Sequence, residues 1–379
     1  MQEGYVTLIG AGCGKGLITV RGQERLREAE VILYDDLIDP DLLLLAREGC
    51  EFIPVGKRYG KKSAQQDKIE DLMIARARAG KNVVRLKGGD SFVFGRGGEE
   101  ILALQEAHVA YDIIPGVSSS IAVPEEMGIP VTHRQVSRSF AVVTGFTADG
   151  TGESFEALAQ LRGTLVFLMG LHNAGRIAAE LIRCGRAPAT PAAVLTRGFT
   201  REEKRYDCTL ATLGQTAEQA ESPAVLVVGE TASFHMEKSR HMPLFGVRVE
   251  VTGSEYFTEL MQKKLMDLGA EVIRTPCLRI HPTLDAIPEN LDSYSFLVFT
   301  SANGVHLFFG EMKRRHTDLR ALSGKKFAVI GSGTARALEE HGIFADFVPT
   351  IYTSRVFGEE LGKELRGKKE KLLILRAKE

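Results

Sequence analysis

A chain of 379 residues is long enough for two or three domains of roughly 100–200 residues each. Its 44% hydrophobic and 26% charged content is that of a folded globular protein, which excludes a disordered or fibrous chain. The net charge of −1 lacks the positive excess of a nucleic-acid binder, so we expect an enzyme that acts on a small molecule, with no nucleic-acid partner.

The sequence indicates neither a membrane span nor a metal cluster. No apolar run approaches the ~20 residues that cross a bilayer, and the N-terminal stretch MQEGYVTLIGAG lacks a signal-type apolar core. The cysteines are far apart, which favours isolated reduced thiols over disulfides or structural zinc. They are Cys13, Cys50, Cys184, Cys208 and Cys277. We expect a cytoplasmic protein with no membrane partner and no metal.

Short apolar strands alternate with helical patterns in the first part of the chain. Strands are expected at VTLIG, VILYD, CEFIPVG, NVVRLKGG and AYDIIPG. A helix is expected over residues 65–79, where Ile69, Leu72, Met73 and Arg76 fall at helical spacing. This alternation favours an α/β fold with a largely parallel sheet.

The strand–helix pattern restarts near Ser139. Here the expected strands are SFAVVTGF, TLVFLMG, PAAVLTRGF and PAVLVVG, with a helix over residues 174–184. The turn-rich segment VPEEMGIPVTHRQVSR separates the two patterns and is interpreted as a junction. We therefore predict two α/β domains, over residues 1–130 and 131–240.

A third pattern follows a polar segment at residues 230–246. Strands are expected at VRVEVTG, AEVIRTP, FLVFTSA, FAVIGSG and ADFVP, with a helix over residues 258–268, and the chain stops at KLLILRAKE. That last strand lacks the helix that normally follows in a parallel α/β unit. We predict an incomplete α/β region over residues 246–379.

The stretch GAGCGKG at residues 10–16 fits two nucleotide-binding patterns only in part. A dinucleotide loop needs a glycine where Lys15 stands, and a P-loop needs a glycine at Ile9 and a hydroxyl at Gly16. Asp35 ends the second strand about where a ribose-binding acid would lie, which keeps the dinucleotide interpretation open. A plain strand–helix turn is the alternative.

The stretch RLKGGDSFVFGRGGEE at residues 85–100 carries more information. Gly88 and Gly89 follow a strand, and glycines there allow a ligand to approach the backbone at the edge where open α/β sheets bind ligands. Asp90 could accept hydrogen bonds from a ligand hydroxyl or amine. A structural turn is the alternative here too.

Together these stretches resemble the uroporphyrinogen-III C-methyltransferases, in the tetrapyrrole methylase family. The motifs are GAGCGKGLIT (10–19), VILYDDL (31–37), PVGKRYG (54–60), RLKGGDSFVFGRGGEE (85–100), IIPGVSSS (113–120), GIPVTHR (128–134), VTGF (143–146) and VFLMGL (166–171). The resemblance covers about the first 240 residues and implies that family's two-domain fold. The chain departs from the family in the first motif, where Cys13 replaces a proline and Lys15 lies in the region of an acid.

The remainder, from about Gly246, resembles the N-terminal part of uroporphyrinogen-III synthase. The motifs are VFTSANGVHLFF (298–309), AVIGSGTARALEEHGIFADFVP (328–349) and YTSRVFGEEL (352–361). This resemblance predicts a fusion of the two enzymes. Because it covers only part of the synthase, we do not expect synthase activity from this chain alone.

The first resemblance implies transfer of methyl groups from S-adenosylmethionine (SAM) to C2 and C7 of uroporphyrinogen III. The products are precorrin-2, formed by way of precorrin-1 for sirohaem or cobalamin synthesis, and S-adenosylhomocysteine (SAH); no metal is needed. The cofactor-binding positions implied are Cys13, Gly88, Gly89, Asp90, Val93, Ser118, Ser119, Met169 and Gly198.

The same resemblance makes Asp35 the candidate proton acceptor and Lys57 the candidate proton donor. Uroporphyrinogen carries eight carboxylates and needs cationic partners, for which the candidates are Arg58, Arg96, His133 and Arg134. A homodimer is also implied. The alternatives are a methyltransferase acting on a later precorrin, a nicotinamide-dependent oxidoreductase, and a tetrapyrrole carrier without catalysis.

Overall fold

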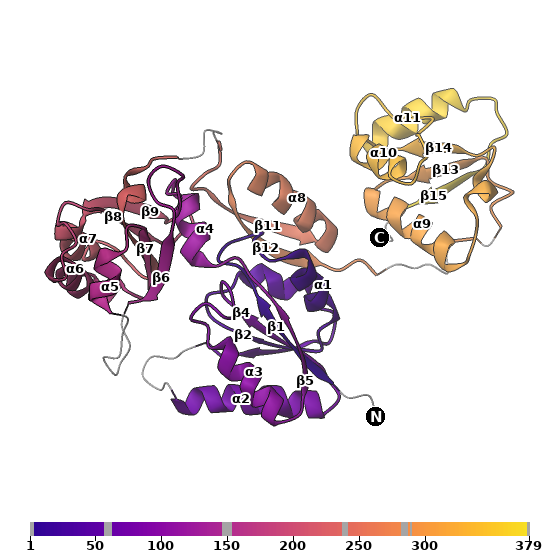
Figure 1. The fold of residues 1–379 in the computed structure, drawn as a ribbon. Helices are drawn as coiled ribbons and strands as arrows, with labels where there is room; N and C mark the ends of the chain where they lie inside the picture. The colour runs from indigo at the N-terminus through magenta and orange to yellow at the C-terminus, as the bar shows by residue number, and fades with distance from the viewer. Residues whose placement is uncertain are drawn as a thin grey trace. The chain divides into compact units, whose positions relative to one another are not determined.

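The computed structural model describes residues 4–56, 63–145, 154–236, 242–281, 287–288 and 290–376. The chain forms two compact units, Met1–Leu278 and Arg279–Glu379 (Figure 1). Helices and strands alternate in both, so the predicted α/β class is confirmed. Among the described residues, no helix combines the length and the apolar character that crossing a bilayer requires.

The first sheet is entirely parallel, as predicted, with the order β3-β2-β4-β1-β5. Strand side chains alternate between its faces, so Val31 and Leu33 pack with α2 and α3, whereas Ile32 packs with α1 and η1. The elements are β1 (Tyr5–Gly10), α1 (Val20–Glu28), β2 (Val31–Tyr34), η1 (Pro40–Leu45), β3 (Glu51–Pro54), α2 (Ser63–Arg78), β4 (Asn82–Lys87), α3 (Gly97–Glu106) and β5 (Ala110–Ile114).

The second sheet has the order β6-β7-β10-β8-β9 and is mixed, because only β6 and β7 pair in parallel. Its elements are α4 (Ser119–Glu126), β6 (Phe140–Thr144), α5 (Phe155–Gln160), β7 (Thr164–Leu168), η2 (Leu171–Asn173), α6 (Ala174–Arg183), β8 (Pro191–Thr196), β9 (Lys204–Thr209), η3 (Leu210–Thr212), α7 (Leu213–Ala217), β10 (Ala224–Val228) and η4 (Glu230–Ser233). The sequence did not indicate β9. Strands buried on both faces, as β7, β8 and β10 are here, do not reveal their direction by periodicity.

Helix α4 occupies the start of the segment that the sequence suggested as a junction between the two patterns. The Ser118 hydroxyl caps this helix by accepting a hydrogen bond from the Ser120 amide at 3.3 Å. Val123 and Met127 pack against the second sheet in one apolar cluster. The helix therefore joins the end of the first sheet to the face of the second.

A parallel βαβ unit completes the first compact unit. It consists of β11 (Arg248–Ser254), α8 (Glu255–Asp267) and β12 (Glu271–Leu278), and its own small core contains Val251, Ala270 and Val272. The structure groups this βαβ unit with the two preceding sheets, whereas the sequence pattern placed it with residues 279–379. The predicted domain limits stay predictions.

The second compact unit holds a parallel sheet of order β14-β13-β15. Its elements are β13 (Phe296–Phe299), α9 (Ala302–Arg314), η6 (Leu319–Leu322), β14 (Lys326–Val329), α10 (Ser332–Glu339), α11 (Ser354–Glu364) and β15 (Leu372–Leu375). The strand predicted at ADFVP is wrong, since Phe347 forms only an isolated bridge with Ala328. The Asp346 carboxylate there accepts the Phe327 amide hydrogen at 2.7 Å, in competition with a backbone ladder.

Candidate functional site

Glycines bring the carboxyl ends of β1, β4 and β5 close together. A Cβ on Gly10 would lie 2.5 Å from the Gly116 nitrogen, and a Cβ on Gly116 would lie 2.1 Å from the Gly89 oxygen, so neither position accepts a side chain. Gly12 and Gly89 exchange two backbone hydrogen bonds of 3.1 and 2.8 Å. Gly89 has φ +68°, and a Cβ there would find only the Ser119 nitrogen, at 3.9 Å. The backbone at Gly89 is thus open to a ligand.

The same loops do not form a dinucleotide site. The Gly12 amide already donates to the Gly89 oxygen, and α1 begins only at Val20, well after β1 ends at Gly10. A dinucleotide loop leads directly into a helix N-terminus that binds the pyrophosphate. The structure favours the strand–helix turn for residues 10–16.

Asp90 ties two of these loops together. Its Oδ1 accepts a hydrogen bond from the Phe92 amide at 2.8 Å, and its Oδ2 accepts one from the Gly116 amide at 3.0 Å. The carboxylate therefore holds the loop after β4 against the loop after β5. A ligand contact of Asp90 would use its remaining lone pairs.

A cavity of 1580 Å³ lies between the loops of the two sheets. All nine predicted cofactor positions line it, namely Cys13, Gly88, Gly89, Asp90, Val93, Ser118, Ser119, Met169 and Gly198. Small-molecule cavities are typically ~300–1,000 Å³, so this one has room for a nucleoside-sized molecule and a larger ligand beside it. The role of each position as a cofactor contact stays a prediction.

Strained backbone marks the second sheet's side of the cavity. Met169, Arg197 and Phe199 follow strands β7 and β8 with φ values of 56°, 51° and 66°, a region that residues with a side chain rarely adopt. Gly198 is required between the last two, since a Cβ there would lie 2.9 Å from the Val123 side chain. Such strain is typical of functional sites, and Met169 is also 61% exposed.

Cys13, in the place of the family's proline, presents a neutral group to the cavity. Burial raises the pKa of its thiol to about 11. At neutral pH the side chain is therefore an uncharged thiol that packs with Val93 and Phe199 against the apolar cluster of the second sheet. It adds no charge beside a cofactor.

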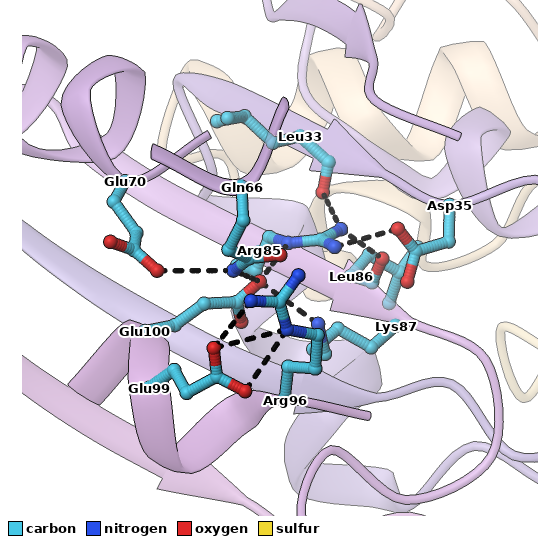
Figure 2. Close-up of polar contacts among 10 residues, drawn as sticks. All are labelled: Leu33, Asp35, Gln66, Glu70, Arg85, Leu86, Lys87, Arg96, Glu99 and Glu100. Atoms are coloured by element: carbon cyan, nitrogen blue, oxygen red, sulfur yellow. Dashed lines mark hydrogen bonds and ion pairs between the residues drawn. The ribbon is translucent and has the colours of Figure 1, made fainter. Parts of the chain in front are cut away.

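Asp35 does not line the cavity, although Asp36 and Asp39, just beyond it, do. Its Oδ1 accepts a hydrogen bond of 2.6 Å from the Arg85 guanidinium, and its side chain is 30% exposed (Figure 2). Arg85 comes from β4 and is itself buried. The carboxylate is thus held in one orientation by Arg85, one residue before Asp36, which lines the cavity.

Glu100 is the centre of the buried polar network that holds Arg85 (Figure 2). Its Oε1 accepts from Arg85 Nε at 3.1 Å, Lys87 Nζ at 2.9 Å and Gln66 Nε2 at 3.3 Å. Its Oε2 has no hydrogen-bond partner among the residues described. Burial, followed by the nearby Arg85 charge, lowers the pKa of Lys87.

Among the described residues, the predicted substrate-binding positions Arg96, His133 and Arg134 do not line the cavity. Lys57 and Arg58 lie outside the described residues. Arg96 makes a bidentate pair with Glu99, its neighbour on α3 (Figure 2). His133 stacks edge-on against Phe234 with ring centroids 4.9 Å apart, and Arg134 is exposed.

The structure adds cations that the sequence did not single out. Lys15, Arg197, Arg201, Lys204 and Arg205 all line the cavity. Four of them lie on or next to the hairpin of β8 and β9, whose existence the sequence did not indicate. In the sequence, the motif TRGF at the end of β8 is the feature that could have indicated these cations.

Comparison with known proteins identifies the family. The family model of the Tetrapyrrole (Corrin/Porphyrin) Methylases matches residues 5–214. The chain belongs to the tetrapyrrole methylase family. A second family model, Uroporphyrinogen-III synthase HemD, matches residues 259–379. The predicted fusion and the predicted methyltransferase class are both confirmed.

Two curated relatives cover different extents of this tetrapyrrole methylase. A porphyrin biosynthesis protein HemD from Ruminiclostridium josui is 37% identical over 386 residues, which span 99% of this chain and 76% of the relative. A uroporphyrinogen-III C-methyltransferase from Methanocaldococcus jannaschii is 46% identical over 237 residues, 61% of this chain and 98% of the relative. The fused arrangement thus has a relative along nearly the whole chain.

Solved structures support the two-domain methylase fold. Uroporphyrin-III C-methyl transferase from Thermus thermophilus has a TM-score of 0.53 and 39% identity, over 60% of this chain and 98% of that one. One structure of that enzyme is a complex with S-adenosyl homocysteine.

Proposed function

We propose that the chain methylates uroporphyrinogen III at C2 and then at C7, giving precorrin-1 and precorrin-2, with SAM as the methyl donor. The observation that carries this proposal is the single cavity lined by all nine of the family's cofactor positions. The size of the cavity suits a large second ligand beside the cofactor, and cations of the β8–β9 hairpin line it together with acidic residues such as Glu202 and Glu203. The product would supply sirohaem or cobalamin synthesis.

The open backbone at Gly89 and the exposed Met169 fit a SAM-sized molecule held between the two sheets. When bound, the cofactor supplies a methyl group that its sulfonium has already activated. The residues of the chain must then align the reactants and manage one proton. Asp35, oriented by Arg85, would accept the proton that the substrate macrocycle loses as the new carbon–carbon bond forms, and Lys57 is the proposed donor. Cations of the β8–β9 hairpin would hold the substrate carboxylates, together with Arg58, Arg96, His133 and Arg134.

The proposal is tested by anaerobic incubation with SAM and uroporphyrinogen III, followed by mass measurement of the product. Addition of two methyl groups is expected. A product with one methyl group or none would contradict the proposed sequence of two transfers. The positions of the methyl groups are then read by NMR with labelled SAM.

The Asp35→Asn variant tests the proton acceptor. It keeps an oxygen for Arg85 but removes the base, so we expect kcat to fall about 10²–10⁴-fold with little change in SAH affinity. Asp112→Asn is the matched control, because Asp112 is a carboxylate of the same sheet that pairs with Arg21 at the surface. Turnover of Asp35→Asn equal to that of the control would remove Asp35 from the mechanism.

A later precorrin is the second candidate substrate. The structure of a cobalt precorrin-4 methyltransferase matches this chain with a TM-score of 0.55 and 25% identity. The same mass assay with that substrate class separates the two proposals. A homodimer and a cytoplasmic location, both expected from the sequence, stay predictions; light scattering of the purified chain tests the first.

A further inference from the structure

Part of the synthase-like region lines the methyltransferase cavity. Met242, Phe245, Met266, Ala270 and Glu271 lie along it together with the cofactor positions of the two sheets. These residues follow the methylase match, which ends at residue 214, and the last three belong to the synthase match, which begins at residue 259. This wall is therefore additional to the matched methylase sequence.

Lys15 connects the glycine loop to this wall. Its Nζ lies 2.9 Å from Asp41 Oδ2 and also donates a hydrogen bond to the backbone oxygen of Val272, in β12. Gln262 of α8 donates from Nε2 to the same Asp41 oxygen at 2.7 Å. One carboxylate thus holds a cation from the first sheet's loop and an amide from the βαβ unit. The Lys15 and Asp41 side chains are only 25% and 17% exposed, so solvent and salt screen this contact less than a surface pair.

A second ionic contact reaches the other sheet. Arg201, in the loop between β8 and β9, places Nε 3.6 Å from Glu271 Oε2. Arg248 of β11 pairs with Glu271 at 2.8 Å and lies 4.0 Å from Glu202. The βαβ unit is therefore attached by polar contacts to both methyltransferase sheets.

The apolar core of the βαβ unit is its own. Its cluster consists of residues between 244 and 272, among them Val251, Ala270 and Val272. This cluster includes no side chain of either sheet, and polar contacts through Asp41 and Glu271 connect the βαβ unit to the sheets. Elements held by few apolar contacts open at low free-energy cost, and a ligand that touches both sides favours the closed arrangement.

We propose that residues 242–272 form a docked third wall of the SAM cavity, that Lys15 anchors it, and that docking and ligand binding strengthen each other. The inference rests on the proposed function, since it takes the SAM-type ligand as the occupant. It gives a role to Lys15, which stands where the family usually has an acid. The synthase-like region would in this way take part in methyl-donor binding.

The test measures SAH binding to the full-length chain by calorimetry. Gln262→Ala removes the amide contact to Asp41, and neither residue lines the cavity. We expect this variant to bind SAH about five-fold or more weakly, within the usual range of coupling between sites. Lys263→Ala, an exposed neighbour on the same helix, is the matched control and should bind like the wild type. Asp41→Asn with Gln262→Ala should weaken binding no more than the stronger single variant.

Hydrogen exchange of the wild type gives a second, independent reading. SAH should slow amide exchange over residues 255–272, which the methylase match does not include. Unchanged exchange there, with Gln262→Ala binding SAH as the wild type does, would overturn the docked wall and leave the proposed function intact. A wild-type chain that binds no SAH would instead contradict the proposed function, and with it this inference.

Discussion

The two methyltransferase sheets bury polar groups of opposite kinds. In the first, Arg85, Lys87 and Glu100 are buried with full charges, at 2%, 3% and 0% exposure. In the second, neutral hydroxyls form a chain in which Thr164 lies 2.7 Å from Thr231 and 3.0 Å from Ser137. The hydroxyls pair with one another, whereas Glu100 keeps one oxygen without a hydrogen-bond partner among the described residues, and the charged network extends through Arg85 to Asp35.

The difference between the two networks indicates what the buried charges of the first sheet are for. Taking an ion pair out of water costs more than its attraction returns unless further hydrogen bonds complete the network, whereas hydroxyls carry a smaller desolvation cost. The second sheet needs its hydroxyl chain only to close the edge of a core. The first sheet needs a rigid cation at Arg85 to orient a carboxylate, and Glu100 is the counter-ion that keeps this cation in place. The variants below test this contrast.

Glu100→Gln should have the largest effect. The substitution removes the negative charge that Arg85 and Lys87 share, so that Asp35, which bonds Arg85, is the carboxylate left in the network. Breaking a buried ion pair in this way costs about 3–5 kcal/mol. Urea unfolding of the variant should show this loss in the free energy of unfolding. Glu99→Gln is the control on the same helix, since Glu99 is 54% exposed and pairs only with Arg96, for which about 0–1 kcal/mol is expected. Equal losses in the two variants would refute the central role of Glu100.

Thr164→Val should have an intermediate effect. It removes the hydroxyl between Ser137 and Thr231, and an unsatisfied buried hydroxyl costs about 1–3 kcal/mol. In the double variant Thr164→Val with Thr231→Val, the loss should be smaller than the sum of the single losses, because both members of one pair are then apolar. The same denaturation series measures it. Strict additivity would show that the hydroxyls act separately.

The pH dependence due to Lys87 should be the smallest effect. Burial lowers the pKa of this lysine below its ordinary 10.5, so in the alkaline range the unfolded chain binds more protons at this position than the folded chain. Stability due to Lys87 should therefore rise as the pH increases toward 10.5, where the unfolded lysine also loses its proton. Lys87→Met should flatten this part of the stability curve relative to the wild type. An unchanged slope between pH 8 and about 10 would show that the network holds Lys87 at an ordinary pKa.

The cofactor positions named from the sequence line one cavity for a physical reason, although their roles as cofactor contacts stay predictions. Glycine motifs after β1, β4 and β5 must lie together, because the carboxyl ends of parallel strands meet at one edge of the sheet. The resemblance then added Met169 and Gly198 from the second sheet, and these positions line the same cavity. On the substrate side, the structure pairs Arg96 with Glu99 and adds the cations of the β8–β9 hairpin to the cavity lining, and the predicted substrate contacts stay predictions.

The hydrophobic pattern of the sequence does not predict strand direction or side-chain partners. The apolar runs of β8 and β10 are compatible with either direction, and the antiparallel pairing follows from β10 entering between β7 and β8. Asp90 was interpreted as a ligand-binding acid, yet its two oxygens hold backbone amides of Phe92 and Gly116. Phe92 lies in the same loop as Asp90, whereas Gly116 comes from a loop distant in sequence, and periodicity reports neither contact.

The sequence by itself determined the α/β class, the family, the fusion of two enzyme types and the glycine loops of the cavity, because these depend on local patterning and on motifs read in order. Only the tertiary structure decided that Glu100 holds Arg85 against Asp35, and that Lys15 reaches Asp41 and the backbone of Val272. Within the glycine loop at residues 10–16, the sequence alone gives no reason for a lysine at position 15. The fold supplies that reason, because it brings residues 41, 262 and 272 to this loop. A partly buried charge needs a partner, and here the partners come from distant parts of the chain.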